Sequence, residues 1–177
     1  KIPSSVEYIG KYAFSNIVLN KLIIPNSVKE IGIGCFNYAQ INSLLKLSEA
    51  IIELPNECFS YAKLPSINCM QNIRIVGNQA FYASKIASSF SECLSLKHVE
   101  LIGNLAFFQN FNIKVVEIFS SLKNIRKNAF CSTSENLIIK FFSFVPLKVD
   151  KDAFQGMNNK AVLMIPKGTR VIFENAI

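Results

Sequence analysis

The chain has 177 residues, half of them hydrophobic, and a mean hydropathy of +0.29. Its longest uninterrupted apolar run is about five residues, far short of the roughly 20 needed to cross a bilayer, so we expect no transmembrane segment. The net charge of +7 comes from lysines and arginines that are scattered singly, without the basic stripe of a nucleic-acid-binding protein. We therefore expect no nucleic-acid partner.

One motif opens the chain and then returns. The segment "IPSSVEYIGKYAF" (2–14) recurs 22 residues later as "IPNSVKEIGIGCF" (24–36). A small residue precedes the final Phe of every copy, an aliphatic residue stands five positions before it, and Gly stands four positions before it in several copies, where we expect it to relieve the backbone at a bend. Aligned on that Phe, the motif occurs seven times at steps of 22–26 residues: Phe14, Phe36, Phe59, Phe81, Phe107, Phe130 and Phe154.

A short strand is expected between each Phe and the next copy. The segments that predict it are "LNKLIIP" (19–25), "INSLLKL" (41–47), "LPSINCM" (64–70) and "IKVVEIF" (113–119). A period of 20–29 residues with one strand per coil is typical of leucine-rich-repeat solenoids. The rest of each coil predicts a turn and a short irregular or helical return. We therefore expect an α/β repeat solenoid, a right-handed coil stack with a parallel sheet on its concave side and a spine of Phe on its convex side.

The repeat covers the chain as a single domain, 1–177, with about seven repeats of 22–26 residues. Since Lys1 to Pro3 lie within the repeated motif, we expect the chain to be part of a longer protein. The step of 26 residues between Phe81 and Phe107 predicts a bulge or displaced loop within residues 87–103. Residues 161–177 keep the strand and then lose the later steps of the motif, which predicts a terminating unit.

Alternation along the strands predicts which side chains leave the sheet. We place these residues inward: Leu22, Ile24, Leu44, Ile67, Val116, Ile118, Leu163 and Ile165. The candidate partner-binding face then consists of Lys21, Ile23, Ser43, Leu45, Ser66, Asn68, His98, Glu100, Val115, Glu117, Ile138 and Lys140, followed by Val162 and Met164. Its aliphatic members would anchor an interface with a polar rim. The alternative is that they satisfy strand propensity on a solvent face.

The cysteines predict free thiols rather than a disulfide framework. Their number is odd and their spacing forms no zinc pattern: Cys35, Cys58, Cys69, Cys93 and Cys131. Cys35 and Cys58 occupy the small-residue position before Phe, which predicts that both are buried. No Asn is followed two places later by Ser or Thr, so the chain also lacks a glycosylation acceptor. Both features favour a reducing compartment.

Few residues could carry chemistry. His98 is the only histidine, and a surface His beside Glu100 explains it better than a general base does. The segment from Gly32 to Gly34 lacks the third Gly and the Lys of a phosphate loop. We therefore expect no enzyme, with no catalytic residue, no metal and no cofactor.

The pattern L-x-x-L-x-I-P-x-S-V-x-x-I-G-x-x-A-F resembles the BspA-like, or Treponema-pallidum-type, leucine-rich repeats. It is clearest in "LNKLIIPNSVKEIGIGCF" (19–36) and "IKVVEIFSSLKNIRKNAF" (113–130), and "IPKGTRVIFENA" (165–176) is similar to a unit that often ends such arrays. The resemblance covers essentially the whole chain. It implies a solenoid with a parallel sheet and a protein-binding role, as in surface proteins linked to adhesion, and it carries over no catalytic residue.

Two functions follow. The first is a surface or extracellular array of the adhesion type that binds a protein or matrix partner, which the resemblance favours. The second is a cytoplasmic scaffold or spacer segment of a larger protein, which the unpaired cysteines and the missing glycosylation acceptors favour.

Overall fold

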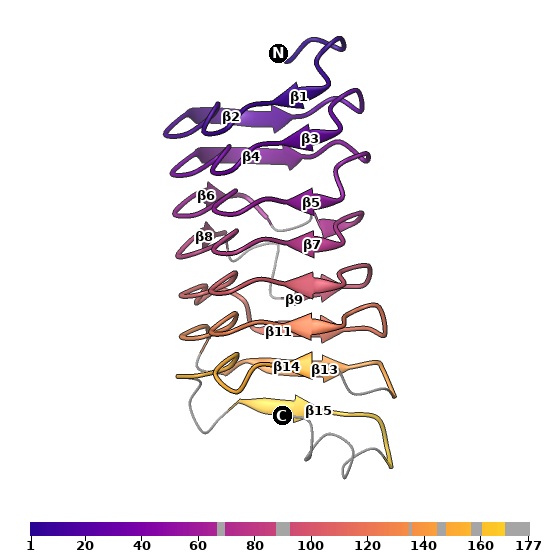
Figure 1. Cartoon of the computed structure of the whole chain (residues 1–177). Coiled ribbons are helices and arrows are strands. Elements are labelled where there is room, and N and C mark those ends of the chain that lie inside the picture. Colours follow the sequence, from indigo (N-terminus) through magenta and orange to yellow (C-terminus); the bar gives the residue numbers. More distant parts are fainter. Residues whose placement is uncertain (67–69, 88–92, 135, 145–147, 157–160, 169–177) are drawn as a thin grey trace.

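The coils contain strands at two places, whereas the sequence predicted a strand at one place only. The computed structural model describes residues 1–66, 70–87, 93–134, 136–144, 148–156 and 161–168. Its coils stack along a single axis, with the N-terminus at one end and residues 162–164 at the other (Figure 1). The strands at the first place, which we call the long strands, lie between a repeat Phe and the next copy of the motif and have two to seven residues. The strands at the second place, which we call the short strands, end five positions before a repeat Phe and have two residues.

The longer strands form two parallel sheets, ordered β2-β4-β6-β8 and β9-β11-β13-β15. Their bounds are β2 (Val18–Ile23), β4 (Gln40–Lys46), β6 (Lys63–Leu64), β8 (Lys85–Ile86), β9 (Cys93–Leu96), β11 (Val115–Ile118), β13 (Ile138–Phe141) and β15 (Val162–Met164). The parallel sheet expected between each Phe and the next copy is therefore confirmed. The gap between β8 and β9 contains the predicted insertion, part of which lies outside the described residues.

The short strands were not predicted. They are β1 (Tyr8–Ile9), β3 (Glu30–Ile31), β5 (Glu53–Leu54), β7 (Ile75–Val76), β10 (Leu101–Ile102), β12 (Asn124–Ile125) and β14 (Lys148–Val149). The second residue of each is the aliphatic residue five positions before Phe. It pairs with the same position of a neighbouring coil, in one sheet of β1 and β3 and in another ordered β14-β12-β10-β7-β5. Because the described part of the chain contains no α-helix, the expected α/β class is wrong: the fold is a parallel β-solenoid whose return path consists of turns and these short strands.

The predicted spine of Phe is confirmed. The rings of all seven repeat Phe stack in one row, with centroids 5.2–5.6 Å apart and interplanar angles of 5–16°. The five central rings are completely buried, whereas Phe14 and Phe154 at the two ends are half-buried. Side chains from both sets of strands join these rings in one hydrophobic core, which no single coil could enclose by itself.

Left-handed residues on both sides of the first six repeat Phe turn the chain from the short strand to the long one. The residues two positions before and two positions after each of these Phe have φ between 49° and 60°. Such backbone is unfavourable for most side chains, but here it is supported by hydrogen bonds to the next coil. For example, the N–H of Tyr38 donates to the carbonyl of Ser60 (2.9 Å), and the N–H of Tyr61 donates to that of Tyr82 (2.7 Å). These turns point the side chains of Tyr38 and Tyr61 out to solvent.

The repeat glycines are required by close packing between coils, and not by the bend that the sequence suggested. A Cβ on Gly77 would lie 2.7 Å from the backbone nitrogen of Asn56, and one on Gly103 would lie 2.6 Å from that of Asn78. Neither glycine has a positive φ. Gly10 occupies the same position in the first coil, where a Cβ would meet nothing within 4 Å.

Replacing Gly77 with Ala should therefore lower the free energy of unfolding by about 1–3 kcal/mol, as overpacked sites do. Gly10→Ala is the matched control, and it should change stability by less than about 0.5 kcal/mol. Urea unfolding followed by far-UV circular dichroism measures both. Equal losses at the two glycines would show that the approach of neighbouring coils is not what requires Gly at this position.

Candidate interaction surface

The predicted outward row is correct on three strands. Lys21 and Ile23 are exposed on β2, on either side of the buried Leu22. On β11 and β13 the half-buried residues alternate with buried ones, so Val115 and Glu117, like Ile138 and Lys140, lie on the outer face of the sheet. This part of the row is a continuous surface, because β11 and β13 pair along their whole length.

The row is wrong at Leu45. This side chain is buried, at 6% exposed, whereas Leu44 is 44% exposed. The pairing explains the difference: Leu19 lies opposite Ile41, but Lys21 lies opposite Leu44 and Leu22 opposite Leu45, so one extra residue of β4 is accommodated between them. Ser43 lies at this irregularity, exposed as predicted, and its hydroxyl donates to the carbonyl of Asn20 (2.9 Å).

Three other predicted residues, Ser66, His98 and Glu100, lie off the sheet. Ser66 is half-buried beyond the end of β6, and Asn68 is outside the described residues. His98 and Glu100 follow the end of β9, in the turn that leads to β10. They therefore do not belong to the outer face of the long strands.

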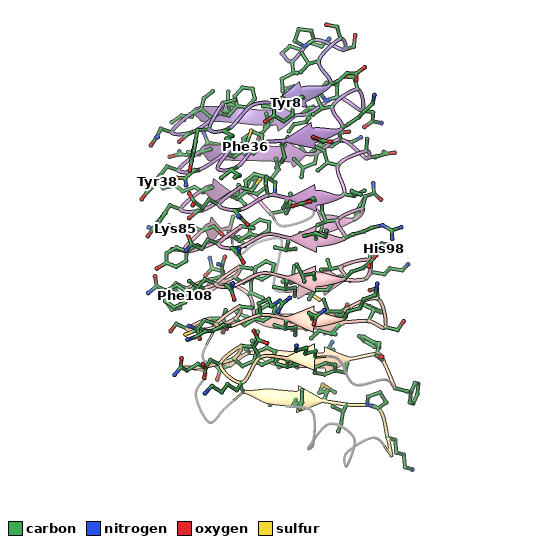
Figure 2. All side chains as sticks on the ribbon, in the orientation of Figure 1. Tyr8, Phe36, Tyr38, Lys85, His98 and Phe108 are labelled. Atoms are coloured by element: carbon green, nitrogen blue, oxygen red, sulfur yellow. The ribbon has the colours of Figure 1, made fainter. Side chains whose placement is uncertain are left out.

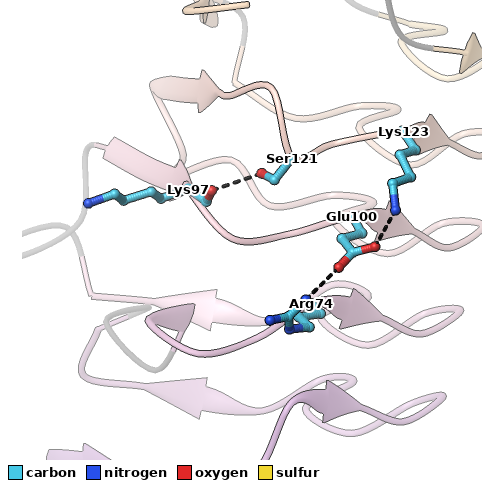
Figure 3. Close-up of polar contacts among 5 residues, drawn as sticks. All are labelled: Arg74, Lys97, Glu100, Ser121 and Lys123. Carbon is cyan, nitrogen blue, oxygen red and sulfur yellow. Dashed lines mark hydrogen bonds and ion pairs between the residues drawn. The ribbon is translucent and has the colours of Figure 1, made fainter.

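Glu100 instead joins its own coil to both neighbouring coils on the side of the short strands. Its carboxylate accepts hydrogen bonds from Lys123 (2.6 Å) and Arg74 (2.9 Å), as Figure 3 shows. The hydrogen bond from Lys123, followed in size of effect by the one from Arg74, lowers the pKa of Glu100, so its carboxyl group stays ionised at neutral pH. Lys29 and Glu7 form a similar pair between the first two coils, at 2.9 Å. Glu7 and Glu100 thus each compensate a cation of a neighbouring coil.

The outer face of the second sheet has two columns of side chains in register. The first column is mostly apolar and consists of Cys93, Val115, Ile138 and Val162. The second consists of Ser95, Glu117, Lys140 and Met164. Within it, Lys140 and Glu117 form an ion pair at 3.7 Å, which leaves little net charge in the middle of this face.

A pair of phenylalanines extends the same face beyond the strand ends. The rings of Phe119 and Phe142 stack with their centroids 4.9 Å apart, and Phe142 is 52% exposed. The N–H of Phe142 donates to the carbonyl of Ile118 (2.8 Å), which continues the ladder of the sheet by one residue. We call the resulting patch the apolar strip; it consists of Val115, Phe119, Ile138, Phe142, Val162 and Met164. Removing the apolar area of this patch from water would favour association with an apolar partner surface.

The cysteines are consistent with their sequence positions. Cys35 and Cys58 are buried, as predicted, and none of the four described cysteines forms a disulfide; Cys69 lies outside the described residues. Burial raises the pKa of Cys35 to about 12, so this thiol is protonated and unreactive at neutral pH. Burial also raises the pKa of Cys93, with a smaller contribution from Glu117.

Groups suited to catalysis or metal binding do not gather in the described ranges. No cluster of three or more His, Cys, Asp or Glu side chains there could hold a metal ion. His98 is exposed and lies on the turn described above. In the same part of the chain, no helix has the length and apolarity to cross a membrane.

A model of the BspA type leucine rich repeat region, defined as six copies of the repeat, matches residues 1–90 and 87–177. Together these matches span the whole sequence. The chain belongs to the BspA-type leucine-rich repeat family. Neither the curated proteins nor the solved structures gave a match. BspA-type repeats are generally non-enzymatic protein-interaction modules and are typically surface-associated.

The BspA-type motif does not reveal a second ordered surface at the turns. There, Tyr38, Tyr61, Tyr82 and Phe108 form a row of rings across four coils. In the sequence these residues stand two places after the repeat Phe in two copies and one place after it in the next two. An aromatic residue soon after the Phe in four consecutive copies was the available signal, but the change of position hides it in an alignment.

Proposed function

We propose that this BspA-type array is an adhesion-type module at the cell surface, and that its apolar strip holds a protein or matrix partner. The observation that carries the proposal is the strip itself, in which apolar side chains of three neighbouring coils share one face with a single ion pair. Aromatic residues and Met are enriched in protein interfaces. The typical surface association of the family supports the location.

The geometry suits a flat, partly apolar contact. Val115 and Ile138 are half-buried by their neighbours in the sheet, so their side chains are already ordered and lose little entropy on binding. Met164, at 51% exposed, and Phe142 supply the surface that a partner would newly cover. The pair of Lys140 and Glu117 can then set the orientation of the partner through polar contacts.

A cytoplasmic scaffold segment is the second candidate, favoured by the absence of a disulfide at the four described cysteines and by the lack of a glycosylation acceptor. Antibody staining of intact and permeabilised cells separates the two locations. Staining that requires permeabilisation would support the scaffold and exclude the adhesion role.

The double variant Ile138→Asp/Met164→Asp should lower binding to immobilised extracellular-matrix proteins at least tenfold, because two charges would have to be desolvated in the interface (about 1.4 kcal/mol per factor of ten). Biolayer interferometry measures the binding. The matched control is Val18→Asp/Ile52→Asp, which changes two exposed aliphatic residues outside the strip (65% and 52% exposed) and the same net charge. Thermal melts should show all three proteins folded.

Equal losses in the strip variant and in the control would mean that net charge governs adhesion. Unchanged binding by the strip variant would exclude the strip as the contact surface. Either result would contradict the proposed site.

A further inference from the structure

The turn edge of the stack carries a row of aromatic rings. Tyr38 and Tyr61 stack with their centroids 4.7 Å apart, Tyr61 meets Tyr82 at 5.4 Å in a tilted arrangement, and Tyr82 stacks on Phe108 at 4.9 Å. Figure 2 shows Tyr38, Lys85 and Phe108 at the same edge, away from His98. The row joins four coils into one continuous surface.

A polar column runs beside these rings. Gln40 lies opposite Lys63 in the sheet, and Lys63 lies opposite Lys85. The ammonium group of Lys63 donates to the side-chain oxygen of Gln40 (3.3 Å), and the side-chain amide of Asn112 donates to the carbonyl of Ile86. Since neighbouring strands are about 4.8 Å apart, the two lysines start from adjacent positions on the same face.

Two hollows adjoin along this column. One, of about 440 Å³, is lined by Gln40, Asn42, Lys63, Lys85 and Asn112, with Pro65 and Ala87 among its other walls. The other, of about 500 Å³, is lined by Tyr61, Lys85, Gln109, Phe111 and Asn112 together with Ala83 and Ser84. Because Lys85 and Asn112 line both, the hollows form one groove, cationic at one end and aromatic at the other.

The charge of this groove is not neutralised by the described residues. No Asp or Glu lines either hollow, and neither Lys63 nor Lys85 forms an ion pair within the described ranges. On the short-strand side, by contrast, Arg74 and Lys123 share Glu100 (Figure 3). Two uncompensated cations in a groove attract an anionic ligand.

We propose that this groove binds an acidic peptide segment of a partner protein. Two carboxylates of the segment would meet Lys63 and Lys85, and a large apolar side chain beyond them would enter the hollow beside Phe111, which is 62% exposed. In an extended peptide, side chains on one face recur every 6.6–6.8 Å or so, a spacing that two flexible lysines can follow. A sulfated polysaccharide would also satisfy the lysines, but it has no large apolar side chain for the aromatic end.

The proposal concerns a different surface from the apolar strip, since none of its residues belongs to the strip. It also assigns a different chemistry, in which carboxylates of the peptide are attracted to the lysines and one apolar side chain of the peptide slows its dissociation. The two proposals can therefore fail separately.

The probe is a fluorescein-labelled, end-capped peptide, Glu-Ala-Glu-Ala-Gly-Phe, and its binding is followed by fluorescence anisotropy at low salt. Saturable binding is expected. The double variant Lys63→Ala/Lys85→Ala should weaken it at least tenfold, and Phe111→Ala should weaken it several-fold. Replacing both Glu of the peptide with Gln, or its Phe with Ala, should have similar effects. All three substituted side chains of the protein are exposed, and thermal melts check that the variants remain folded.

The matched control is Lys11→Ala/Lys97→Ala, which removes two exposed lysines outside the groove and lowers the net charge equally. It should bind the peptide like the unchanged protein. Equal weakening by the two lysine pairs would mean attraction by net charge only, and it would overturn the proposal. A peptide that binds equally well without its Phe would do the same. Heparin fragments that require Lys63 and Lys85, when the peptide does not bind, would assign the groove to a sulfated sugar instead.

Discussion

Leu45→Asp should unfold the solenoid, whereas Leu44→Asp, one residue earlier, should leave it folded. Leu45 points into the core at 6% exposed, so an aspartate there would bury an unpaired charge and also remove apolar packing. We expect a loss of more than about 4 kcal/mol, which is comparable with the whole stability of many domains. Leu44 is 44% exposed and lies opposite Lys21, so an aspartate at this position can pair with that lysine across the strands.

Urea unfolding of the two variants beside the unchanged chain measures the difference. For Leu44→Asp we expect a change within about 0.5 kcal/mol. The opposite ranking would mean that β4 keeps the spacing of 22 residues along its whole length, so that the outer face would carry Leu45. Similar large losses at both positions would mean that Leu44 is also covered.

The repeat and the Phe ladder could be predicted from sequence because they depend on positions that recur at nearly constant steps. Each Phe meets the Phe of the next coil, so the requirement for an aromatic ring is renewed in every copy and becomes visible in one sequence. The outward position of Val115 and Ile138 was predictable for a similar reason. In both strands, half-buried and buried residues alternate from the first residue to the last.

The short strands before each Phe could not be predicted, since two residues show no periodicity. What defines Tyr8–Ile9 or Asn124–Ile125 as a strand is pairing with another coil, and a local pattern does not contain that information. The helical return was a wrong expectation for the same reason. The glycines are a comparable case: Gly77 looks like a bend residue in sequence, but the atoms that exclude a side chain belong to Pro55 and Asn56 of the preceding coil.

The error at Leu45 arose from counting. The step from Phe36 to Phe59 is one residue longer than the first step, and counting forward from Phe36 assigns that residue to the wrong place. The pairing shows that it is absorbed before Leu44, near Ser43. A one-residue shift exchanges the two faces of a strand, so the candidate site was sensitive to an irregularity that the core tolerates.

Phe81→Ala should lower the free energy of unfolding by about 3–5 kcal/mol, through the lost transfer energy and the cavity left behind. The ring is completely buried, and its centroid lies 5.4 Å from that of Phe59 and 5.2 Å from that of Phe107. A cavity at this point also interrupts the ladder, so contacts between coils on both sides weaken. Chemical denaturation followed by circular dichroism and by tyrosine fluorescence gives the loss and shows whether the coils still unfold together.

Two further Phe→Ala variants test whether the loss of stability depends on the burial and stacking of the ring. Phe14 stacks on Phe36 alone, at 5.6 Å, and is half-buried, so its loss should be smaller than that of Phe81. Phe144 is 69% exposed, and its replacement should change stability by about 0.5 kcal/mol at most. This order, with Phe81 most damaging and Phe144 least, follows from the number of ring neighbours and the burial of each. A loss at Phe81 no larger than that at Phe144 would mean that hydrogen bonds between the strands hold the coils together without the rings.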